Sequence, residues 1–315
     1  MINSFTIWAL VIWLVYIVTL LLVPPILLGV IGKVKARLQN RIGASIFQPV
    51  YDLDKLLNKG ETVSQVTSWV FRSSACLNAV VVILIALMAP CLSYKPETYG
   101  GDLFLLIYLF ALSRFMTVLS ALDAGSAFGG FGSSREVTLA FLVEPAIILC
   151  MAALAVVSHN SDLGYVFSLT NSALSMHPIL WVMAGLTLFL SSLVELSRMP
   201  VDDPTTHLEL TMVHEAMILE NSGRNLALVK YSQQLKMFVL LSLTGQCFLH
   251  AFPFYWHSGE LTAGLASLTI VFVLGMVLAV LEATTVKLRW TRIPEFIAYP
   301  VAMSLLCLLM AIGKS

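Results

Sequence analysis

Eight long apolar stretches limit most strongly how this chain can fold. A helix that crosses the hydrocarbon of a bilayer needs about 20 mostly apolar residues, because each residue adds about 1.5 Å of length. The whole chain of 315 residues is 58% hydrophobic and 11% charged, whereas soluble domains carry about 25% charged residues. The sequence therefore predicts an all-α integral membrane protein that forms a single membrane domain over residues 1–315. The eight expected transmembrane helices are residues 5–31, 70–93, 103–121, 137–158, 177–196, 235–256, 260–283 and 296–313.

Charge and cysteine content exclude several other classes of protein. The 18 basic and 18 acidic residues give a net charge of zero, so the chain lacks the basic field of a nucleic-acid-binding protein. The five cysteines stand singly, with no C-x-x-C pair. This spacing excludes a disulfide framework, a zinc finger and an iron–sulfur cluster of the usual kinds.

The basic residues give the expected orientation in the membrane. Most of them fall on one side of the predicted spans, while only Lys95 and Lys314 fall on the other and Arg114 lies within a span. Because cytoplasmic loops are rich in Lys and Arg, we expect both termini outside the cytoplasm of a cell inner membrane, and cytoplasmic loops at about residues 32–69 and 197–234. The basic residues assigned to the cytoplasm are Lys33, Lys35, Arg37, Arg41, Lys55, Lys59, Arg72, Arg135, Arg198, Arg224, Lys230, Lys236, Lys287, Arg289 and Arg292.

The first apolar stretch is interpreted as a retained helix and not as a secretory signal. It has no basic residue before it and no small-residue cleavage site after Leu20, and its lysines follow it. Pro24 and Pro25 are expected to bend it near its end.

Four ionisable side chains lie in or near the apolar stretches: Arg114, Glu144, Glu195 and Glu282. A charge at the centre of a spanning helix costs roughly 2.5–3.5 kcal/mol, so such residues face the protein interior, pair with one another or line water. With the orientation above, the three glutamates lie in the cytoplasmic half of the membrane. They are predicted to share a hydrated cavity that forms an ion pathway. The alternative is that each acid pairs with an arginine to fix helix packing, and for Glu282 that the side chain reaches the membrane surface.

The second cytoplasmic loop carries a predicted helix from Pro204 to Asn221. His207, Glu209, His214 and Glu215 lie on it, but the zinc-protease pattern H-E-x-x-H fails because residue 218 is isoleucine. We favour a surface helix that docks on a soluble partner, with histidines that titrate near neutral pH. A metal site made of the two histidines and Glu209 is the less favoured interpretation.

Two further local patterns bear on the cytoplasmic side. Residues 50–57 of the first loop predict an amphipathic helix at the membrane surface. Ser133 and Glu136 have the spacing of a capping box, which predicts a helix start there and places Arg135 in its first turn.

Four strings of residues, in this order, resemble those of a known family. They are R-L-Q-N-R-I-G at 37–43, Q-P-x-x-D-x-x-K at 48–55, S-R-E-V-T-L-A-F-L-V-E-P at 134–145 and V-E-L-S-R-M-P-V-D-D-P at 194–204. Together they resemble the subunit 1 family of respiratory complex I. This family comprises a membrane subunit of NADH–quinone oxidoreductase and its relatives in membrane-bound nickel–iron hydrogenases. The resemblance covers nearly the whole chain and implies a core of eight spans.

Within that family the chain is more similar to the hydrogenase branch, which includes formate hydrogenlyase subunit 4 and the hydrogenase-4 membrane component. The strings T-T-H-L-E-L-T-M-V-H-E-A-M at 205–217 and L-E-A-T-T-V-K-L-R at 281–289 carry this preference. His207 stands where the quinone-reducing branch tends to have an acid, and Glu282 where that branch tends to have a basic residue.

The resemblance implies a function in a complex. Its intramembrane acids correspond to Glu144 and Glu195, and Arg37, Arg41, Arg135 and Asp202 match residues at the junction with a peripheral arm. The chain itself would hold no redox cofactor. The expected partners are hydrogenase-type large and small subunits and an iron–sulfur subunit, which hold the nickel–iron and iron–sulfur centres, together with antiporter-like membrane subunits and the lipid bilayer. The chain would anchor the arm and couple electron transfer to proton or sodium movement.

Two other functions remain open from the sequence. One is the quinone-binding membrane subunit of a complex I-like NADH–quinone oxidoreductase. The other is a stand-alone secondary transporter, which inverted repeats would favour, although the sequence contains no visible repeat. A purely structural membrane anchor explains the spans but leaves the four costly charges unexplained.

Overall fold

The computed structural model describes residues 4–92, 101–168, 177–203, 212–256 and 259–313. This part of the chain is helical and contains no β-strand, as the sequence predicts. The long helices are α1 (Ser4–Leu38), α3 (Trp69–Met88), α4 (Leu103–Asp123), α5 (Ala127–Ser158), α8 (Pro178–Glu195), α10 (Gly223–His250), α12 (Glu260–Thr284) and α13 (Ile293–Ile312). The short helices are α2 (Gln48–Leu57), α6 (Leu163–Val166), α9 (His214–Ile218), α11 (Pro253–Trp256) and the 3₁₀ helix η1 (Trp290–Arg292).

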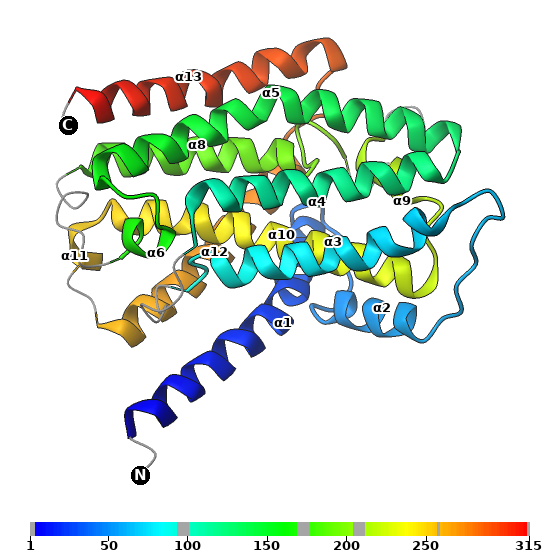
Figure 1. Cartoon of the computed structure of the whole chain (residues 1–315), viewed down its shortest axis with the longest axis horizontal. Helices are drawn as coiled ribbons and strands as arrows, with labels where there is room; N and C mark the ends of the chain where they lie inside the picture. Colours follow the sequence, from blue (N-terminus) through cyan, green and yellow to red (C-terminus); the bar gives the residue numbers. More distant parts are fainter. Residues whose placement is uncertain (1–3, 93–100, 169–176, 204–211, 257–258, 314–315) are drawn as a thin grey trace.

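The long helices form an elongated bundle. α13 packs on α5 and α8, α3 packs along α4, and α1 lies against α12. Helices α2 and α9 lie at one end of the bundle, whereas α1 begins and α13 ends at the opposite end (Figure 1). This arrangement agrees with an even number of crossings. The chain is thus a multi-pass membrane protein.

Seven described helices have the length and composition of a membrane span, and the eighth expected span corresponds to α10. α10 lies inside the bundle, in contact with α1, α3, α8 and α12. Its buried residues include the polar side chains of Ser232, Gln234, Ser242, Thr244 and Gln246. Because other helices and not lipid surround α10, it can carry polar groups that a lipid-facing helix excludes.

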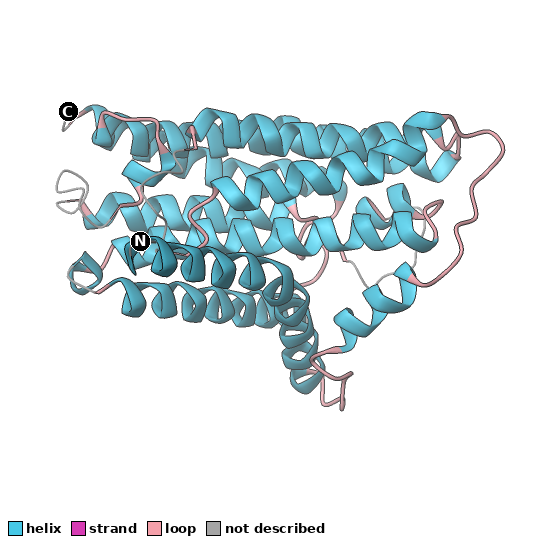
Figure 2. Ribbon diagram, turned by 60° about the horizontal axis from the view of Figure 1, so that its bottom comes forward, coloured by secondary structure: helices cyan, strands magenta, loops and turns pink. Residues whose placement is uncertain are grey.

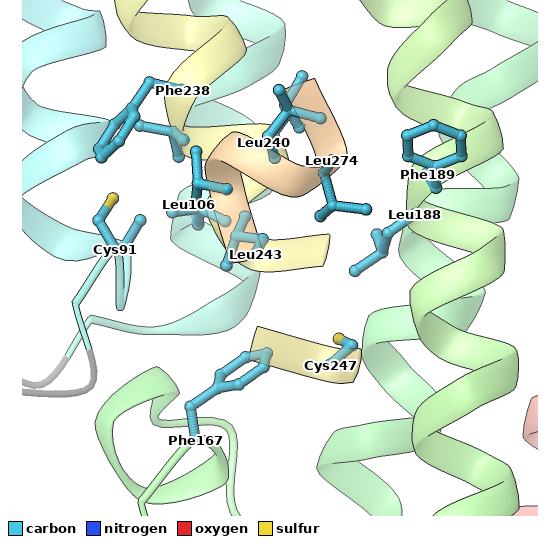
Figure 3. Packing of buried hydrophobic residues seen from close by; sticks show 14 of the residues in the cluster. Cys91, Leu106, Phe167, Leu188, Phe189, Phe238, Leu240, Leu243, Cys247 and Leu274 are labelled. Carbon is cyan, nitrogen blue, oxygen red and sulfur yellow. The ribbon is translucent and has the colours of Figure 1, made fainter. Parts of the chain in front are cut away.

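The apolar core of the bundle surrounds α10. Leu240, Leu243 and Cys247 of α10 lie near Leu106 of α4 and Leu188 of α8 (Figure 3). The side chains of Leu243 and Cys247 are almost completely buried. In a membrane protein such packing supplies the contacts that hold helices together, since lipid tails are as apolar as the core.

Several helix boundaries differ from the prediction. α1 continues to Leu38, so the first loop begins later than residue 32. Pro24 and Pro25 lie within α1, and Figure 2 shows a bend in this helix before its C-terminal turns, as the two missing backbone donors lead one to expect. α10 begins at Gly223, so much of the expected second loop is helical.

The predicted capping box at Ser133 is wrong. α5 begins at Ala127, and its N-cap is Ser126, whose hydroxyl accepts a hydrogen bond from the Gly129 amide. Ser133 lies inside the helix and donates its hydroxyl to the Gly129 carbonyl at 2.7 Å. Arg135 therefore lies in the third turn of α5 and not in the first.

The predicted amphipathic helix of the first loop is present as α2. It has Gln48 and Pro49 at its N-terminus, where proline is favoured because its missing amide has no helical partner anyway. None of its residues is buried. α2 is thus available on the side of the molecule where α9 also lies (Figure 1).

Candidate functional site: a buried charge cluster

The guanidinium of Arg114 connects three helices in the middle of the bundle. It projects from α4 and forms ion pairs with Glu144 of α5 and with Glu195, the last residue of α8. Arg114 and Glu195 are buried, whereas the Glu144 side chain keeps 36% of its exposure. The structure therefore brings together three of the four ionisable residues, Arg114, Glu144 and Glu195, that were singled out from the apolar stretches.

Two further charged residues, neither of which was predicted from the sequence to join these three, complete this cluster. Lys236 of α10 places its Nζ 2.7 Å from Glu195 Oε1. Glu136 of α5 has its Oε1 3.8 Å from Arg114 Nε. Lys236 is the second residue of the predicted span 235–256, and Glu136 immediately precedes the predicted span 137–158. The signal was present in the sequence, because an ionisable residue beside an apolar stretch can reach the same interior as one inside it.

The Arg114 cluster, which comprises Arg114, Glu136, Glu144, Glu195 and Lys236, has one more acid than base. With every group ionised, three carboxylates and two cations give it a formal charge of −1. Burial of an uncompensated charge is costly. The cluster consequently favours uptake of one additional proton.

A polar cavity opens beside the cluster. It contains about 460 Å³ of space between atoms. Its lining includes Arg114, Glu136, Glu195, His214 and Lys236 together with Asn78, Ser113, Thr117, Ser232 and Gln233. A cavity with this many hydrogen-bonding groups can hold water, which needs two to four polar partners.

A second cavity, mostly apolar, lies on another side of Arg114. It has about 450 Å³ of space between atoms and is lined by Glu144, Glu195 and Arg114 among leucine, isoleucine and phenylalanine side chains. Arg114 and Glu195 line both cavities. The ion pair between them therefore stands at the boundary between a polar and an apolar space.

Glu282 does not share this site, and the prediction that the three glutamates line one cavity is wrong for it. Its two carboxylate oxygens contact Lys35 at 3.4 Å and Arg198 at 2.9 Å. Neither cavity that reaches Arg114 is lined by Glu282. The alternative considered from the sequence, an acid paired with basic residues to fix helix packing, describes its geometry. We name Lys35, Arg198 and Glu282 the Glu282 cluster.

Asp202 and Arg135 hold the start of α9 against the bundle. Asp202 accepts a hydrogen bond from the Val213 amide at 3.0 Å and an ion pair from Lys287. Arg135 donates to the Met212 carbonyl at 3.3 Å. These contacts fix the backbone immediately before His214.

α9 approaches α5 closely at Gly132. A Cβ atom added at this glycine would lie 2.8 Å from the Val213 carbonyl oxygen and 3.0 Å from the Met217 side chain. Only a residue without a side chain allows this contact. Gly132 thus sets how deeply α9 enters the bundle.

His214 differs from its prediction as a surface histidine that titrates near neutral pH. It lines the polar cavity, and its Nε2 atom is buried without a hydrogen-bond partner among the described residues. Burial, with the nearby charges of Lys236 and Arg198, lowers its pKa from 6.5 to about 4. His214 is therefore neutral at physiological pH. The helix that carries it, α9, is also shorter than the predicted one.

The remaining predicted junction residues that the structure describes do not join the charge cluster. Arg37 lies in the last turn of α1 and Arg41 follows that helix. Glu215 is partly buried next to His214. His207 and Glu209 lie outside the described residues. Within the described ranges, no group of three or more His, Cys, Asp or Glu side chains is placed to hold a metal ion.

Comparison with known proteins identifies the family. The family model described as NADH dehydrogenase matches residues 10–312. The chain belongs to the NADH dehydrogenase family. Formate hydrogenlyase subunit 4 of Escherichia coli (strain K12) is a relative that is 30% identical over 289 residues, which are 90% of this chain and 92% of that protein. Hydrogenase-4 component C of the same organism is 34% identical over 236 residues, 74% of this chain and 73% of that protein.

A solved structure shows the same fold. A chain of the membrane-bound sulfane sulfur reductase, an archaeal respiratory membrane complex, superposes with a TM-score of 0.75 at 19% sequence identity. The match covers 96% of this chain and 99% of that one. The resemblance of the motifs to the complex I subunit 1 family and its hydrogenase branch is thus confirmed.

Proposed function

We propose that this chain is the membrane subunit of an ion-translocating, hydrogenase-type oxidoreductase complex similar to formate hydrogenlyase. It anchors a peripheral redox arm and couples electron transfer to ion movement. Its relatives are subunits of formate hydrogenlyase and of hydrogenase-4, which supports this assignment. The Arg114 cluster and the polar cavity beside it form the first part of the ion pathway.

The redox chemistry belongs to partner subunits. Nickel–iron and iron–sulfur centres lie in the hydrogenase-type large and small subunits and in an iron–sulfur subunit, and antiporter-like membrane subunits continue the pathway. The peripheral arm docks where α2 and α9 lie, on the cytoplasmic face of the inner membrane, and both termini lie outside the cytoplasm. The concentration of basic residues at this end of the bundle supports that orientation.

One observation carries the proposal: five ionisable side chains from four helices meet inside a lipid-embedded bundle, and four of them, Arg114, Glu136, Glu195 and Lys236, line a polar cavity. Such groups are costly to keep in a membrane and generally serve ion or proton movement. The cluster holds three acids and two bases, so one carboxylate can take up a proton while each base keeps an ionised acid as its partner. The unequal numbers leave the cluster able to exchange a proton.

The test is substitution of Glu195 or Glu144 by glutamine in the complete complex. Glutamine keeps the size and hydrogen-bonding shape of the side chain while it removes the charge and the exchangeable proton. We expect assembly, measured by co-purification of the partner subunits, to be retained. The number of ions moved per electron transferred should fall at least about tenfold. Unchanged coupling in both variants would contradict the proposal.

A quinone-binding subunit is the other member of the family to consider, and the position of Asp202 argues against it. In this chain the Asp202 carboxylate is engaged by the Val213 amide and by Lys287. It is therefore occupied in holding α9. Quinone reduction by the purified complex that is lost on substitution of Asp202 or Arg41 would favour the quinone enzyme.

A further inference from the structure

We propose that His214 is a proton-transfer residue, whose Nε2 atom accepts a proton from water on the α9 side of the polar cavity and passes it to the carboxylates of the Arg114 cluster. This inference rests on the proposed function and names the group through which a proton enters the site. It gives α9 a chemical role in addition to contact with a partner.

The geometry of the cavity supports this role. His214 lines the same cavity as Glu136, Glu195 and Lys236. Its Nε2 is buried, yet it has no hydrogen-bond partner among the described residues. An unpaired buried nitrogen costs about 1–3 kcal/mol unless a water or an incoming proton satisfies it. The lone pair of Nε2 is therefore available to water or to a proton in the cavity that Glu136 and Glu195 also line.

The surrounding structure positions this ring. Asp202 binds the amide of Val213, the residue before His214, and Arg135 binds the carbonyl of Met212. Both contacts originate outside α9, from the segment after α8 and from α5. A change in the position of Asp202 or Arg135 would therefore be transmitted to the imidazole.

The charges that face His214 keep it ready to accept a proton. Burial is the largest cause that lowers the pKa of His214 to about 4; the charges of Lys236 and Arg198 lower it further, whereas the Gln233 side chain raises it. Glu136 and Glu195 face the same cavity with negative charge, and Arg114 with positive charge. The neutral ring is an acceptor at physiological pH, and once protonated it releases the proton readily.

The transfer balances in charge and in atoms. An entering proton, carried by cavity water as a hydronium ion, passes to Nε2: an O–H bond of the hydronium breaks, an N–H bond forms, and neutral water and a transient imidazolium remain. That N–H bond then breaks as an O–H bond forms on a cluster carboxylate, either directly or through cavity water. The imidazole returns to its neutral state and the carboxylate becomes a carboxylic acid, so the formal charge of the cluster changes from −1 to zero.

The same contacts disfavour a sodium ion at this step. Both oxygens of Glu195 face cations, Arg114 and Lys236, and one oxygen of Glu144 faces Arg114. A bound metal cation would need several free oxygen ligands and would be repelled by two neighbouring charges. A proton needs only one lone pair, which the imidazole nitrogen supplies.

The experiment uses the complete complex in sealed vesicles, driven by its own redox reaction, with a pH-sensitive dye as the reporter. The medium contains no sodium, and a sodium ionophore is present. We expect His214→Asn to lower the number of protons moved per electron at least about tenfold. The matched control is His159→Asn, because His159 is exposed at the end of α5 and its backbone has φ 51°, which asparagine tolerates. The control should behave as the wild type.

A second variant separates chemistry from structure. His214→Ala removes the ring and leaves space for a small base, so added imidazole should restore proton movement several-fold in this variant and leave the wild type unchanged. Assembly is checked by co-purification. Two results would overturn the assignment of His214. One is that His214→Asn moves as many protons per electron as the wild type. The other is that His214→Ala loses proton movement and added imidazole does not restore it.

The Glu195→Gln variant distinguishes failure of this inference from failure of the proposed function. If Glu195→Gln loses coupling while His214→Asn retains it, the ion pathway stands and only the role of His214 is wrong. If both retain full coupling, the proposed function itself fails. Ion movement in the wild type that stops without sodium would contradict proton transfer at this step.

Discussion

The Arg114 cluster and the Glu282 cluster are both buried groups of charges, but their compositions are opposite. The Arg114 cluster has three acids and two bases and borders two cavities. The Glu282 cluster has one acid and two bases, and Glu282 lines neither of these cavities. An excess of acid next to free space permits proton exchange. The two bases around the single buried carboxylate join α1, α12 and the segment after α8.

The largest expected effect is the loss of the arginine at the centre of the first cluster. Arg114→Met leaves Glu144 and Glu195 without their shared cation. Removal of one partner from a buried ion pair costs about 3–5 kcal/mol, because the remaining charge is buried and unpaired. We expect little assembled complex in membranes, as measured by immunoblotting of this chain and by co-purification.

The control for that variant is Arg72→Met. Arg72 is exposed at the start of α3, and surface substitutions usually change stability by less than about 0.5 kcal/mol. Normal assembly in Arg114→Met would show that the cluster tolerates its three acids without the Arg114 cation. The distinction between the two clusters would then lose its electrostatic basis.

The pair Glu195→Gln and Glu282→Gln tests the comparison directly. Both substitutions remove one buried negative charge and conserve shape. We expect Glu195→Gln to lower the ions moved per electron at least about tenfold, and Glu282→Gln to leave this ratio unchanged while it lowers the Tm of the purified complex. The result that would reverse the comparison is loss of coupling in Glu282→Gln together with normal coupling in Glu195→Gln.

A glycine pair on α5 tests whether α9 must enter the bundle. Gly132→Ala places a methyl group against the Val213 carbonyl and the Met217 side chain, and such overpacking typically costs about 1–3 kcal/mol. Displacement of α9 should reduce proton coupling several-fold and increase proteolysis of the segment before α10.

Gly130→Ala is the matched control, because nothing lies within 4 Å of the added methyl group. Alanine is favoured over glycine within a helix by roughly 0.5–1 kcal/mol. This variant should be as stable as the wild type or slightly more stable. Equal behaviour of the two variants would indicate that the close approach of α9 to α5 is not needed.

The smallest expected effect concerns the pH dependence of stability. The pKa of His214 is about 4 in the folded chain and 6.5 in its ordinary state. Below pH 6.5 the unfolded chain binds a proton that the folded chain does not, so the free energy of unfolding falls as the pH decreases from 6.5 towards 4. The slope from this group is at most about 1.4 kcal/mol per pH unit.

The measurement is the Tm of the purified complex across this pH range. His214→Asn should show a smaller decrease in Tm on acidification than the wild type, and His159→Asn the same decrease. An identical decrease in all three proteins would show that His214 takes up its proton equally in the folded and unfolded states.

The apolar stretches were sufficient to predict the membrane fold and most of its helices. They also led to the Arg114 cluster, because the cost of a charge in lipid singles out Arg114, Glu144 and Glu195. The choice of ion-pair partner was not predictable in the same way. Glu282 and Glu195 both lie at the ends of apolar helices, and only the three-dimensional arrangement pairs one with Lys35 and the other with Arg114.

His214 shows a second limit of the sequence. Its position in a predicted cytoplasmic loop suggests an exposed helix, but Gly132 and Asp202 hold α9 inside the bundle. Contacts of this kind join segments that are distant along the chain, and the spacing of residues gives no sign of them. The burial of His214 and its lowered pKa could therefore not be deduced from the composition of the loop.

The position of α10 also bears on how the protein is made. Hydrophobic stretches leave the translocation channel for lipid according to their own apolarity, and α10 is the one expected span that does not meet the criteria of a membrane helix among the described residues. Its serine, threonine and glutamine side chains are shielded from lipid only by the neighbouring helices, and Gln246 donates a hydrogen bond to Ser267 of α12. During biogenesis α10 therefore has to pack against the earlier helices α1, α3 and α8 in order to enter the membrane. Its integration is cooperative and follows theirs.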